Sequence, residues 1–511
     1  MATIPAHRPP KMVSAWPWLR WLLAGIFVVA LALRWWRMGQ INTLVFDEIY
    51  YPVFANRYLL GDYVYNSHPP LSQYLIAVGI WLGSHLGAHL PIGQELANGL
   101  TGSVRSTWSY RWFNAIAGAW IPVILGLIAT RLSGNRLFGA IAALIALLDG
   151  LFLVESRFGL NNIYLILFGL LSHLFLLLAM TPPLQIPQQG RGRFQTRPDN
   201  PSLLRWQWLT LAGICLGCTV AVKWNGLGFG LALYGLWLGL RLRLPLTALE
   251  EEPSPRLGEG WVRAQGRRYS QPIQIESGIR RLSLGQFLGY FVALPLLVYG
   301  LLWMPHLWLN PELNLWQLHR AMVTFHGAVG SGAEVHPYCS PWYSWPLMAR
   351  PVAYFYSTAA DLRSLVPAMP PLPHGFETVV YAVHAMGNPL LWWCATGAIA
   401  LMLLGCLSFR PSATAGIWRY CLWGYGANLL PWALVSRCTF LYHYMSALVF
   451  AQLALAYWIW QAWEQQGLSR AIAVSVLGLG GVAFWFWLPI YLGLPLTPEG
   501  YQLRMWFAQW I

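Results

Sequence analysis

One polar segment stands between long apolar runs, and its residue types could do acid–base chemistry. Residues 46–74 contain the adjacent carboxylates Asp47 and Glu48, and further on His68 before two prolines. A partly buried Asp can take a proton from an alcohol when its pKa and position suit the transfer. Asp47 could instead cap a helix that begins near Ile49, since Asp is a preferred N-cap residue. The segment alone leaves both roles open.

Beyond this segment the chain has the composition of a polytopic membrane protein. It has 511 residues, of which 57% are hydrophobic, against roughly 45–50% in soluble domains. Because a span needs about 20 apolar residues, we expect one all-α membrane domain over residues 1–511 with about eleven transmembrane helices. The apolar runs place these helices near residues 17–34, 110–131, 136–153, 160–180, 206–222, 226–242, 284–304, 385–408, 417–435, 440–460 and 470–491.

The distribution of Lys and Arg predicts the orientation of these helices. The first apolar run is followed by Arg34 and Arg37 instead of a small-residue cleavage site, so we interpret it as a retained helix. The loops 181–205 and 243–283 are basic and rich in Pro, Gly and Gln, as flexible cytoplasmic linkers are. The net charge of +14 thus reflects a positive-inside bias and not a nucleic-acid partner. The N-terminus is predicted in the cytoplasm and the C-terminus outside.

Two other long loops, 38–109 and 305–384, fall together on the predicted outer face. Within the first, residues 49–60 and 71–86 are apolar and aromatic but too short to cross a bilayer. Such segments are typical of helices that lie in the membrane interface, with Tyr and Trp at the level of the headgroups. Asp47 and Glu48 are then expected at the outer membrane boundary.

Several basic side chains are predicted on the same face as Asp47. Arg111 precedes the second span, Lys223 ends the fifth, and Arg437 and His443 flank the start of the tenth. Each alone could be an ordinary charge at the end of a span. Together, beside a carboxylate, they suit a phosphate-bearing lipid that faces a nucleophile. The sequence contains no glycine-rich phosphate loop or dinucleotide motif, which disfavours a nucleotide-sugar or ATP as the direct substrate.

The second outer loop adds histidines and aromatic rings without a metal-binding motif. It has neither an H-E-x-x-H sequence nor closely spaced Cys and His residues, so no metal site is predicted. Cys339 lies in this loop and Cys438 on the same predicted face, and a disulfide between them stays open. Trp342 could stack on a sugar or dock the loop into the membrane interface. The further candidates for substrate contacts are His68, Arg157, Asn162, His336, Tyr338, Trp342 and Tyr442.

A series of short motifs resembles the protein O-mannosyltransferase family. In chain order they are Phe46-Asp47-Glu48, His68-Pro69-Pro70-Leu71, Arg111, Leu153-Val154-Glu155-Ser156-Arg157, Val222-Lys223-Trp224-Asn225-Gly226, His336-Pro337-Tyr338-Cys339-Ser340-Pro341-Trp342-Tyr343-Ser344-Trp345-Pro346, and Arg437-Cys438-Thr439-Phe440-Leu441-Tyr442-His443-Tyr444. The similarity extends over residues 40–460. An Asp-Glu pair alone would be a weak signal, but the whole series is specific.

The resemblance implies a GT-C glycosyltransferase that moves mannose from a polyprenyl (dolichyl-type) phosphate to Ser or Thr hydroxyls of secreted proteins, with inversion. By analogy, Asp47 is the general base and Glu48 supports or positions the acceptor. The donor phosphate is then bound by Arg111, Lys223, Arg437 and His443. Such enzymes need no metal or other cofactor for the sugar transfer.

The sequence departs from the family pattern in two places. The family usually carries an Asp where Asn162 stands, so a polar role survives there without the charge. Eukaryotic members also carry a sugar-binding-like MIR domain in the second outer loop, and residues 305–384 have no room for one. These features point to a bacterial member in the cytoplasmic membrane, with its site facing outwards and with a conceivable association with the export machinery.

Two alternatives stay open at this point. A transferase of the same fold could place the sugar on a lipid or glycan, as aminoarabinose transferases do, because the motifs for the lipid phosphate would look much the same. A transporter of lipid-linked sugar would need ionisable residues along a path near mid-bilayer. Most charges here fall at the ends of spans on one face, which favours an enzyme.

Overall fold

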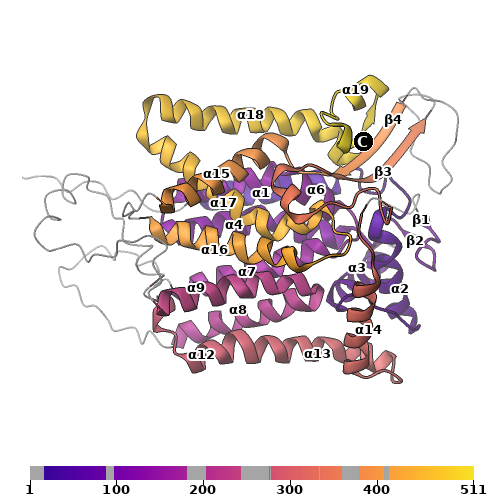
Figure 1. Ribbon diagram of the computed structural model, residues 1–511. Helices are drawn as coiled ribbons and strands as arrows, with labels where there is room; N and C mark the ends of the chain where they lie inside the picture. The colour runs from indigo at the N-terminus through magenta and orange to yellow at the C-terminus, as the bar shows by residue number, and fades with distance from the viewer. Residues whose placement is uncertain are drawn as a thin grey trace, which may run out of the picture.

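The computed structural model describes residues 17–87, 97–180, 203–242, 276, 278–332, 334–359, 379–407 and 414–511. The predicted cytoplasmic loops 181–205 and 243–283 fall almost entirely outside these ranges. Most of the described residues form helices that run side by side along one direction (Figure 1). In chain order these are α1 (Pro17–Trp35), α4 (Trp112–Ser133), α5 (Arg136–Leu147), α6 (Gly150–Arg157), α7 (Asn162–Met180), α8 (Leu203–Val222), α9 (Leu227–Arg241), α12 (Leu284–Leu288), α13 (Leu294–Leu309), α15 (Pro389–Leu407), α16 (Ala415–Leu429), α17 (Met445–Gln465) and α18 (Gly467–Leu492).

The predicted count of eleven membrane spans is not confirmed. Within the described ranges, seven helices are long and apolar enough to cross a membrane, or eight if α5 and α6 form one bent span. The predicted span 136–153 is broken by a bend of 57° between α5 and α6. Asp149 causes this break because its side chain accepts a hydrogen bond from the Phe152 N–H, at 3.0 Å, and so caps α6.

The two long outer loops meet at one end of the bundle, called here the outer end. The first contributes the short 3₁₀ helix η1 (Phe46–Ile49), α2 (Tyr51–Leu60) and α3 (Leu71–Gly87), and the strands β1 (Ala97–Asn98) and β2 (Arg105–Ser106). Both helices expected in this loop therefore form. The second contributes α14 (Leu315–Ala328), which lies across the bundle direction (Figure 1). Leu318 and Met322 of α14 pack on Trp303 of α13.

A small antiparallel sheet at the outer end was not expected from the sequence. Its strand order is β3 (Val352–Ala359), β4 (Val379–Ala385) and β5 (Pro495–Leu496). Every residue of β4 is buried, and a strand buried on both faces has the same continuous apolar pattern as a span. The span predicted from residue 385 therefore began too early, and the helix α15 starts only at Pro389.

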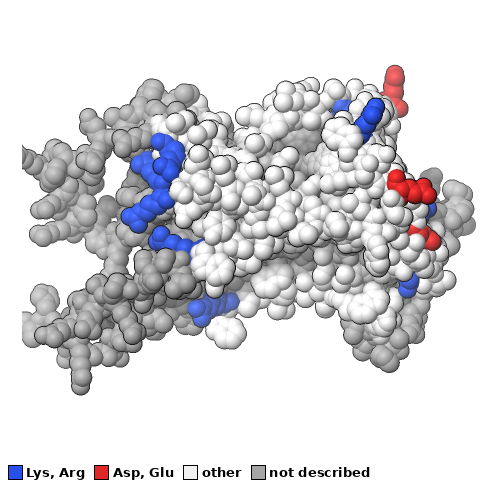
Figure 2. Space-filling model, turned by 90° about the horizontal axis from the view of Figure 1, so that it is seen from below, with Lys and Arg blue, Asp and Glu red and all other residues white. Residues whose placement is uncertain are grey.

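Charge is divided between the two ends of the bundle. Figure 2 shows most of the visible Lys and Arg side chains gathered at one end, and the visible Asp and Glu side chains at the other. The acidic side chains lie at the outer end, which carries α2, α14 and β3 in Figure 1. The sequence likewise places most of the basic residues at the end opposite the two long outer loops.

A disulfide joins two distant segments at the outer end. Cys339 of the second outer loop is bonded to Cys438, which lies 99 positions further along the sequence. Backbone hydrogen bonds flank it: Ser340 N–H donates to the Thr439 carbonyl at 2.8 Å, and Cys438 N–H donates to the Gly330 carbonyl at 2.7 Å. The segment that begins with Arg437 is thus fastened to the second outer loop on both sides of the disulfide.

A buried ion pair fastens the first outer loop to the bundle. Arg111 Nη2 lies 2.6 Å from Glu48 Oε2, and both side chains are fully buried. All five N–H groups of the guanidinium have acceptors: two bond to Glu48, two to the carbonyls of Met38 and Ile41, and one to that of Thr43. Lys could not replace this planar set of donors.

Glu48 completes the same network. Besides Arg111, its carboxylate accepts hydrogen bonds from the Val45 N–H at 2.9 Å and the Gly159 N–H at 2.7 Å. The pair therefore ties together the loop before η1, the start of α4 and the corner between α6 and α7. Two predictions were wrong here, because a fully enclosed Glu48 cannot reach an acceptor and Arg111 has no N–H left for a phosphate.

Replacing Arg111 by Lys should destabilise the protein, because it leaves the Glu48 carboxylate and several carbonyls without donors. Breaking a buried pair costs about 3–5 kcal/mol, so we expect a clear drop in the Tm of the purified protein, measured by thermal unfolding in detergent. Arg320→Lys is the control, since Arg320 is exposed on α14. Equal Tm values for the two variants would show that the pair does not hold the loop.

Candidate functional site

Asp47 presents a free carboxylate at the outer end. It belongs to η1, is half-buried, and its carboxylate accepts no hydrogen bond from any described residue. The helix-cap role is wrong for Asp47: α2 begins at Tyr51 with Tyr50 at its N-cap, and the Val45 N–H is capped by Glu48. Burial raises the pKa of Asp47 to about 6, and the nearby Lys223 opposes this rise. A carboxyl with this pKa is a base at neutral pH.

The residue before Asp47 is held in a conformation that side chains rarely adopt. Phe46 has φ +50°, which is unfavourable for a bulky residue and persists only where its surroundings demand it. Its ring stacks on Tyr354 at 4.6 Å between centroids and meets Phe440 and Tyr442 edge-on. This cluster, drawn from both outer loops and the start of α17, sets the direction in which Asp47 points.

Lys223 lies next to Asp47, at the end of α8. It is buried; its Nζ donates to the Asn162 Oδ1 at 3.3 Å and lies 5.5 Å from the centre of the Tyr442 ring. Asn162 is neutral, so it orients the ammonium without cancelling its charge. Lys223 pairs with no carboxylate within 4.0 Å in the part of the chain that the structure describes.

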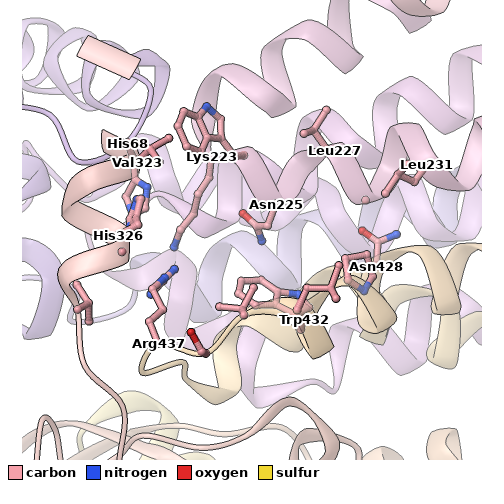
Figure 3. Close-up of a pocket in the computed structure, with 18 of the residues that line it drawn as sticks. His68, Lys223, Asn225, Leu227, Leu231, Val323, His326, Asn428, Trp432 and Arg437 are labelled. Atoms are coloured by element: carbon pink, nitrogen blue, oxygen red, sulfur yellow. The ribbon is translucent and has the colours of Figure 1, made fainter. Parts of the chain in front are cut away.

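Arg437 supplies a second cation, and it too has no acidic partner among the residues that the structure describes. It is half-buried, and its Nη1 donates to the carbonyl of Cys438 at 3.0 Å. The adjacent disulfide fastens its backbone to the second outer loop. Figure 3 shows the ends of Arg437 and Lys223 directed toward one another. Two like charges that converge, with no carboxylate within 4.0 Å of either among the described residues, form a site for an anion.

These cations stand at the polar end of a cavity of about 530 Å³. His68 and His326 complete the polar end (Figure 3). From there the cavity follows apolar side chains of α9 and of the segment after α16. Several of these are exposed on the surface of the bundle: Leu227 (50%), Leu231 (45%) and Leu434 (90%). The cavity thus joins an anion site to an apolar opening.

A buried carboxylate beside the site was missed as a functional candidate. Glu155 of α6 accepts hydrogen bonds from the Tyr354 hydroxyl and, at 3.2 Å, from Asn162 Nδ2. It therefore anchors the amide that orients Lys223. Glu155 lies inside the motif Leu153-Val154-Glu155-Ser156-Arg157, which the sequence analysis identified. The sequence alone could not distinguish it from an ordinary polar residue at a turn. His326 was also missed, because nothing marks one histidine of α14 over another.

The remaining predicted residues have mixed roles. Arg157 was expected to contact substrate, but its Nη1 donates to the carbonyls of Leu33, Arg34 and Trp36 at 2.8–3.0 Å and so caps α1. That prediction is wrong, because the side chain is buried and occupied. Asn162 supports Lys223 as described above.

His443 does not line the cationic cavity. Its ring lies between those of Trp345 and Trp432, at 5.9 and 4.5 Å, and its Nδ1 is 3.1 Å from the Phe440 N. It therefore supports the segment between Arg437 and α17, and it is not among the residues that line the cavity. The role of His443 as a direct phosphate ligand stays a prediction.

Three aromatic candidates lie around the site. Tyr442 lies beneath Lys223, His336 packs at 5.0 Å against Phe440, and Tyr338 lies beside His336. Trp342 lines a neighbouring cavity of about 390 Å³, which shares Arg437 with the first. Within the described ranges, no group of three His, Cys, Asp or Glu residues could hold a metal ion.

Comparisons with known proteins agree with this geometry. A model of the dolichyl-phosphate-mannose-protein mannosyltransferase family matches residues 24–250, and a model of the C-terminal four-helix transmembrane region of protein O-mannosyltransferases matches residues 313–510. A polyprenol-phosphate-mannose–protein mannosyltransferase of Mycolicibacterium smegmatis is 26% identical, over 96% of this chain and 93% of the relative. One from Corynebacterium glutamicum is 25% identical, over 98% and 95%.

A solved structure supports the fold. The protein O-mannosyltransferase complex of S. cerevisiae bound to the sugar donor has a TM-score of 0.71 at 14% identity, with 98% of this chain and 93% of that chain covered. The two family models together match most of this chain, and the relatives align over nearly their whole length. The chain is therefore a membrane glycosyltransferase with the GT-C fold and belongs to the protein O-mannosyltransferase family.

Proposed function

We propose that this protein transfers mannose from a polyprenyl phosphate to Ser or Thr hydroxyls of exported proteins, with inversion at the anomeric carbon. One observation carries the proposal: the free carboxylate of Asp47 lies beside Lys223, which together with Arg437 forms the cationic end of a cavity that opens on an apolar surface. The names of the relatives, polyprenol-phosphate-mannose–protein mannosyltransferases, support the same donor and acceptor.

Asp47 is proposed as the general base. It takes the proton of the acceptor hydroxyl while the oxygen attacks the anomeric carbon from the face opposite the phosphate. Such a single displacement inverts the configuration and needs one base. The leaving phosphate gains negative charge, and Lys223 and Arg437 are the groups that stabilise it. The proposal assigns no step to a metal or other cofactor.

The cavity suits a lipid-linked donor. Its cationic end takes the phosphate, while the first part of the polyprenyl chain follows Leu227 and Leu231 toward the exposed Leu434. An apolar wall with a few placed polar groups is the usual construction of such sites. A soluble nucleotide-sugar would gain nothing from the apolar opening.

We further propose that the site faces the outside of the cytoplasmic membrane, with the N-terminus in the cytoplasm. The basic end of the bundle is the cytoplasmic end by the positive-inside rule (Figure 2). The Cys339–Cys438 disulfide supports the same orientation, because disulfides persist in oxidising compartments. An acceptor protein would then meet the site as it leaves the export machinery.

Replacing Asp47 by Asn should abolish transfer, because an amide cannot take the hydroxyl proton. We expect a loss of at least about 100-fold, in line with general-base catalysis, measured with membranes, radiolabelled polyprenyl-phosphate mannose and a Ser/Thr-rich peptide. The donor should still bind, since its phosphate ligands are unchanged. Full activity would exclude Asp47 as the base. In the same assay with the wild-type protein, label that appears in lipid or glycan instead of peptide would contradict a protein acceptor.

The pH dependence should report on Asp47. Its pKa is raised from 3.8 to about 6, so the active deprotonated form is present above pH 6 and lost as the pH falls through that value. We expect kcat/KM for the acceptor to fall about tenfold per pH unit below the midpoint. Lys223 lowers this pKa, so the midpoint should move upward in Lys223→Met. An unchanged midpoint in that variant would contradict the proximity of the two groups.

Removing either cation should weaken donor binding. Hydrogen bonds to charged groups contribute about 1.5–3 kcal/mol, so Lys223→Met and Arg437→Gln should each raise the KM for the donor roughly 10- to 100-fold. Arg350→Gln is the matched control: Arg350 also lies at the outer end, but it bonds to the Pro337 carbonyl and is outside the cavity. If all three variants keep the same KM, the cavity is not the donor site.

A further inference from the structure

Two imidazole rings face each other at the polar end of the cationic cavity. His68 follows α2 and His326 belongs to α14; their rings stack with centroids 5.0 Å apart and an interplanar angle of 30°. Figure 3 places both beside the ends of Lys223 and Arg437. The ring pair thus joins the two outer loops at the position proposed for the donor phosphate.

The hydrogen bonding of His326 determines where its proton lies. Its Nε2 is 2.8 Å from the carbonyl oxygen of Ser67. Since a carbonyl only accepts hydrogen bonds, the neutral ring carries its proton on Nε2 and keeps a lone pair on Nδ1. His326 therefore has one nitrogen able to take up a proton.

The surroundings keep both rings neutral while the cavity is empty. Burial is the main effect, and it lowers the pKa of His326 to about 4 and that of His68 well below its usual range. The charged and titratable groups that face the pair are Lys223 at the end of α8, and Arg437 and His443 from the segment before α17. All three act in the same direction, because each is a cation or can become one.

We propose that the His68–His326 pair takes up one proton when the donor phosphate becomes the product phosphate, and so binds the product in its doubly charged form. This step rests on the function proposed above. It gives the two histidines a part in the reaction that differs from that of Lys223 and Arg437, which bind the phosphate in both of its charge states.

The charges of the reaction require such a response. The bond from the anomeric carbon to the phosphate oxygen breaks, and its electron pair stays on that oxygen. The acceptor oxygen forms the new bond, and its proton passes to Asp47. The phosphate thus changes from a diester with one negative charge to a monoester with two. The imidazole pair then takes one proton from solvent, and Asp47 later returns one to solvent.

The second negative charge of the phosphate monoester is what causes the His68–His326 pair to take up a proton. An opposite charge within about 4–6 Å raises the pKa of an imidazole by roughly 1–3 pH units, and the monoester carries two such charges. The pKa of the pair can therefore pass through neutral pH in the product complex, while the donor complex leaves the pair neutral. The same shift makes monoester binding depend on a proton that donor binding does not need.

The test measures proton uptake by titration calorimetry of the full-length protein in detergent. Farnesyl phosphate serves as the monoester and its methyl ester as the diester, each in two buffers of different ionisation enthalpy. At about pH 8 the free monoester is already a dianion, since its second pKa is near 6. Burial lowers the pKa of Lys223 to about 8, so Lys223 can gain a proton with either ligand. We therefore expect the monoester to cause uptake of about one proton more than the diester. Equal uptake for both ligands would overturn the proposal.

Variants assign the proton to the pair. His326→Gln and His68→Gln should each bind the diester as wild type does, bind the monoester roughly tenfold more weakly, and take up the same number of protons with both ligands. His319→Gln is the control on the same helix, because His319 bonds to Tyr299 and the Leu315 carbonyl and is outside the cavity. It should keep the uptake.

Asp47→Asn separates the pair from the general base. This variant should also keep the uptake, and its loss there would assign the proton to Asp47 and overturn the proposal. The wild-type comparison of the two ligands needs no variant, so a variant that fails to fold leaves the test intact. If neither ligand binds the wild-type protein, the proposed donor site itself is wrong, which is a different outcome from binding without proton uptake.

Discussion

The outer end depends on the buried ion pair between Glu48 and Arg111. Two buried charges are costly unless every donor and acceptor is satisfied, and here the guanidinium has five acceptors and the carboxylate four donors. Successive residues of a 3₁₀ helix point about 120° apart, so η1 directs Asp47 away from the buried position of Glu48. One carboxylate is used for structure, and its neighbour is left free for chemistry.

The cations of the site are positioned without being neutralised. Lys223 is oriented by the neutral amide of Asn162, which Glu155 in turn holds. Arg437 is fixed through its backbone by the adjacent disulfide and hydrogen bonds. Because neither cation is paired with a carboxylate in the described part of the chain, both keep their attraction for an anion. Helices, outer loops and the disulfide thus combine to make one preorganised anion site.

Much of the fold could be predicted from the sequence, because a long apolar run flanked by charged residues can form few structures other than a membrane helix. The runs at α1, α4, α7 and α18 became helices close to their predicted bounds. The errors have physical causes. The buried strand β4 has the same apolar pattern as the start of a span, and a single Asp at position 149 divides a run that is otherwise continuous. Neither feature changes the count of spans. Within the described ranges, the predicted spans 206–222, 226–242 and 417–435 correspond to α8, α9 and α16, which are not among the helices long and apolar enough to cross a membrane.

The sequence by itself determined the family, the membrane character and the set of polar residues gathered at the outer end. The types of residue and their order along the chain are enough to identify these properties, because motifs and apolar runs can be recognised without a structure. Only the tertiary structure divided the set into roles. Arg111, Arg157 and Lys223 are all basic residues at the ends of spans, and they differ only in whether carbonyls and carboxylates surround them. That depends on contacts between distant segments, which local sequence does not encode.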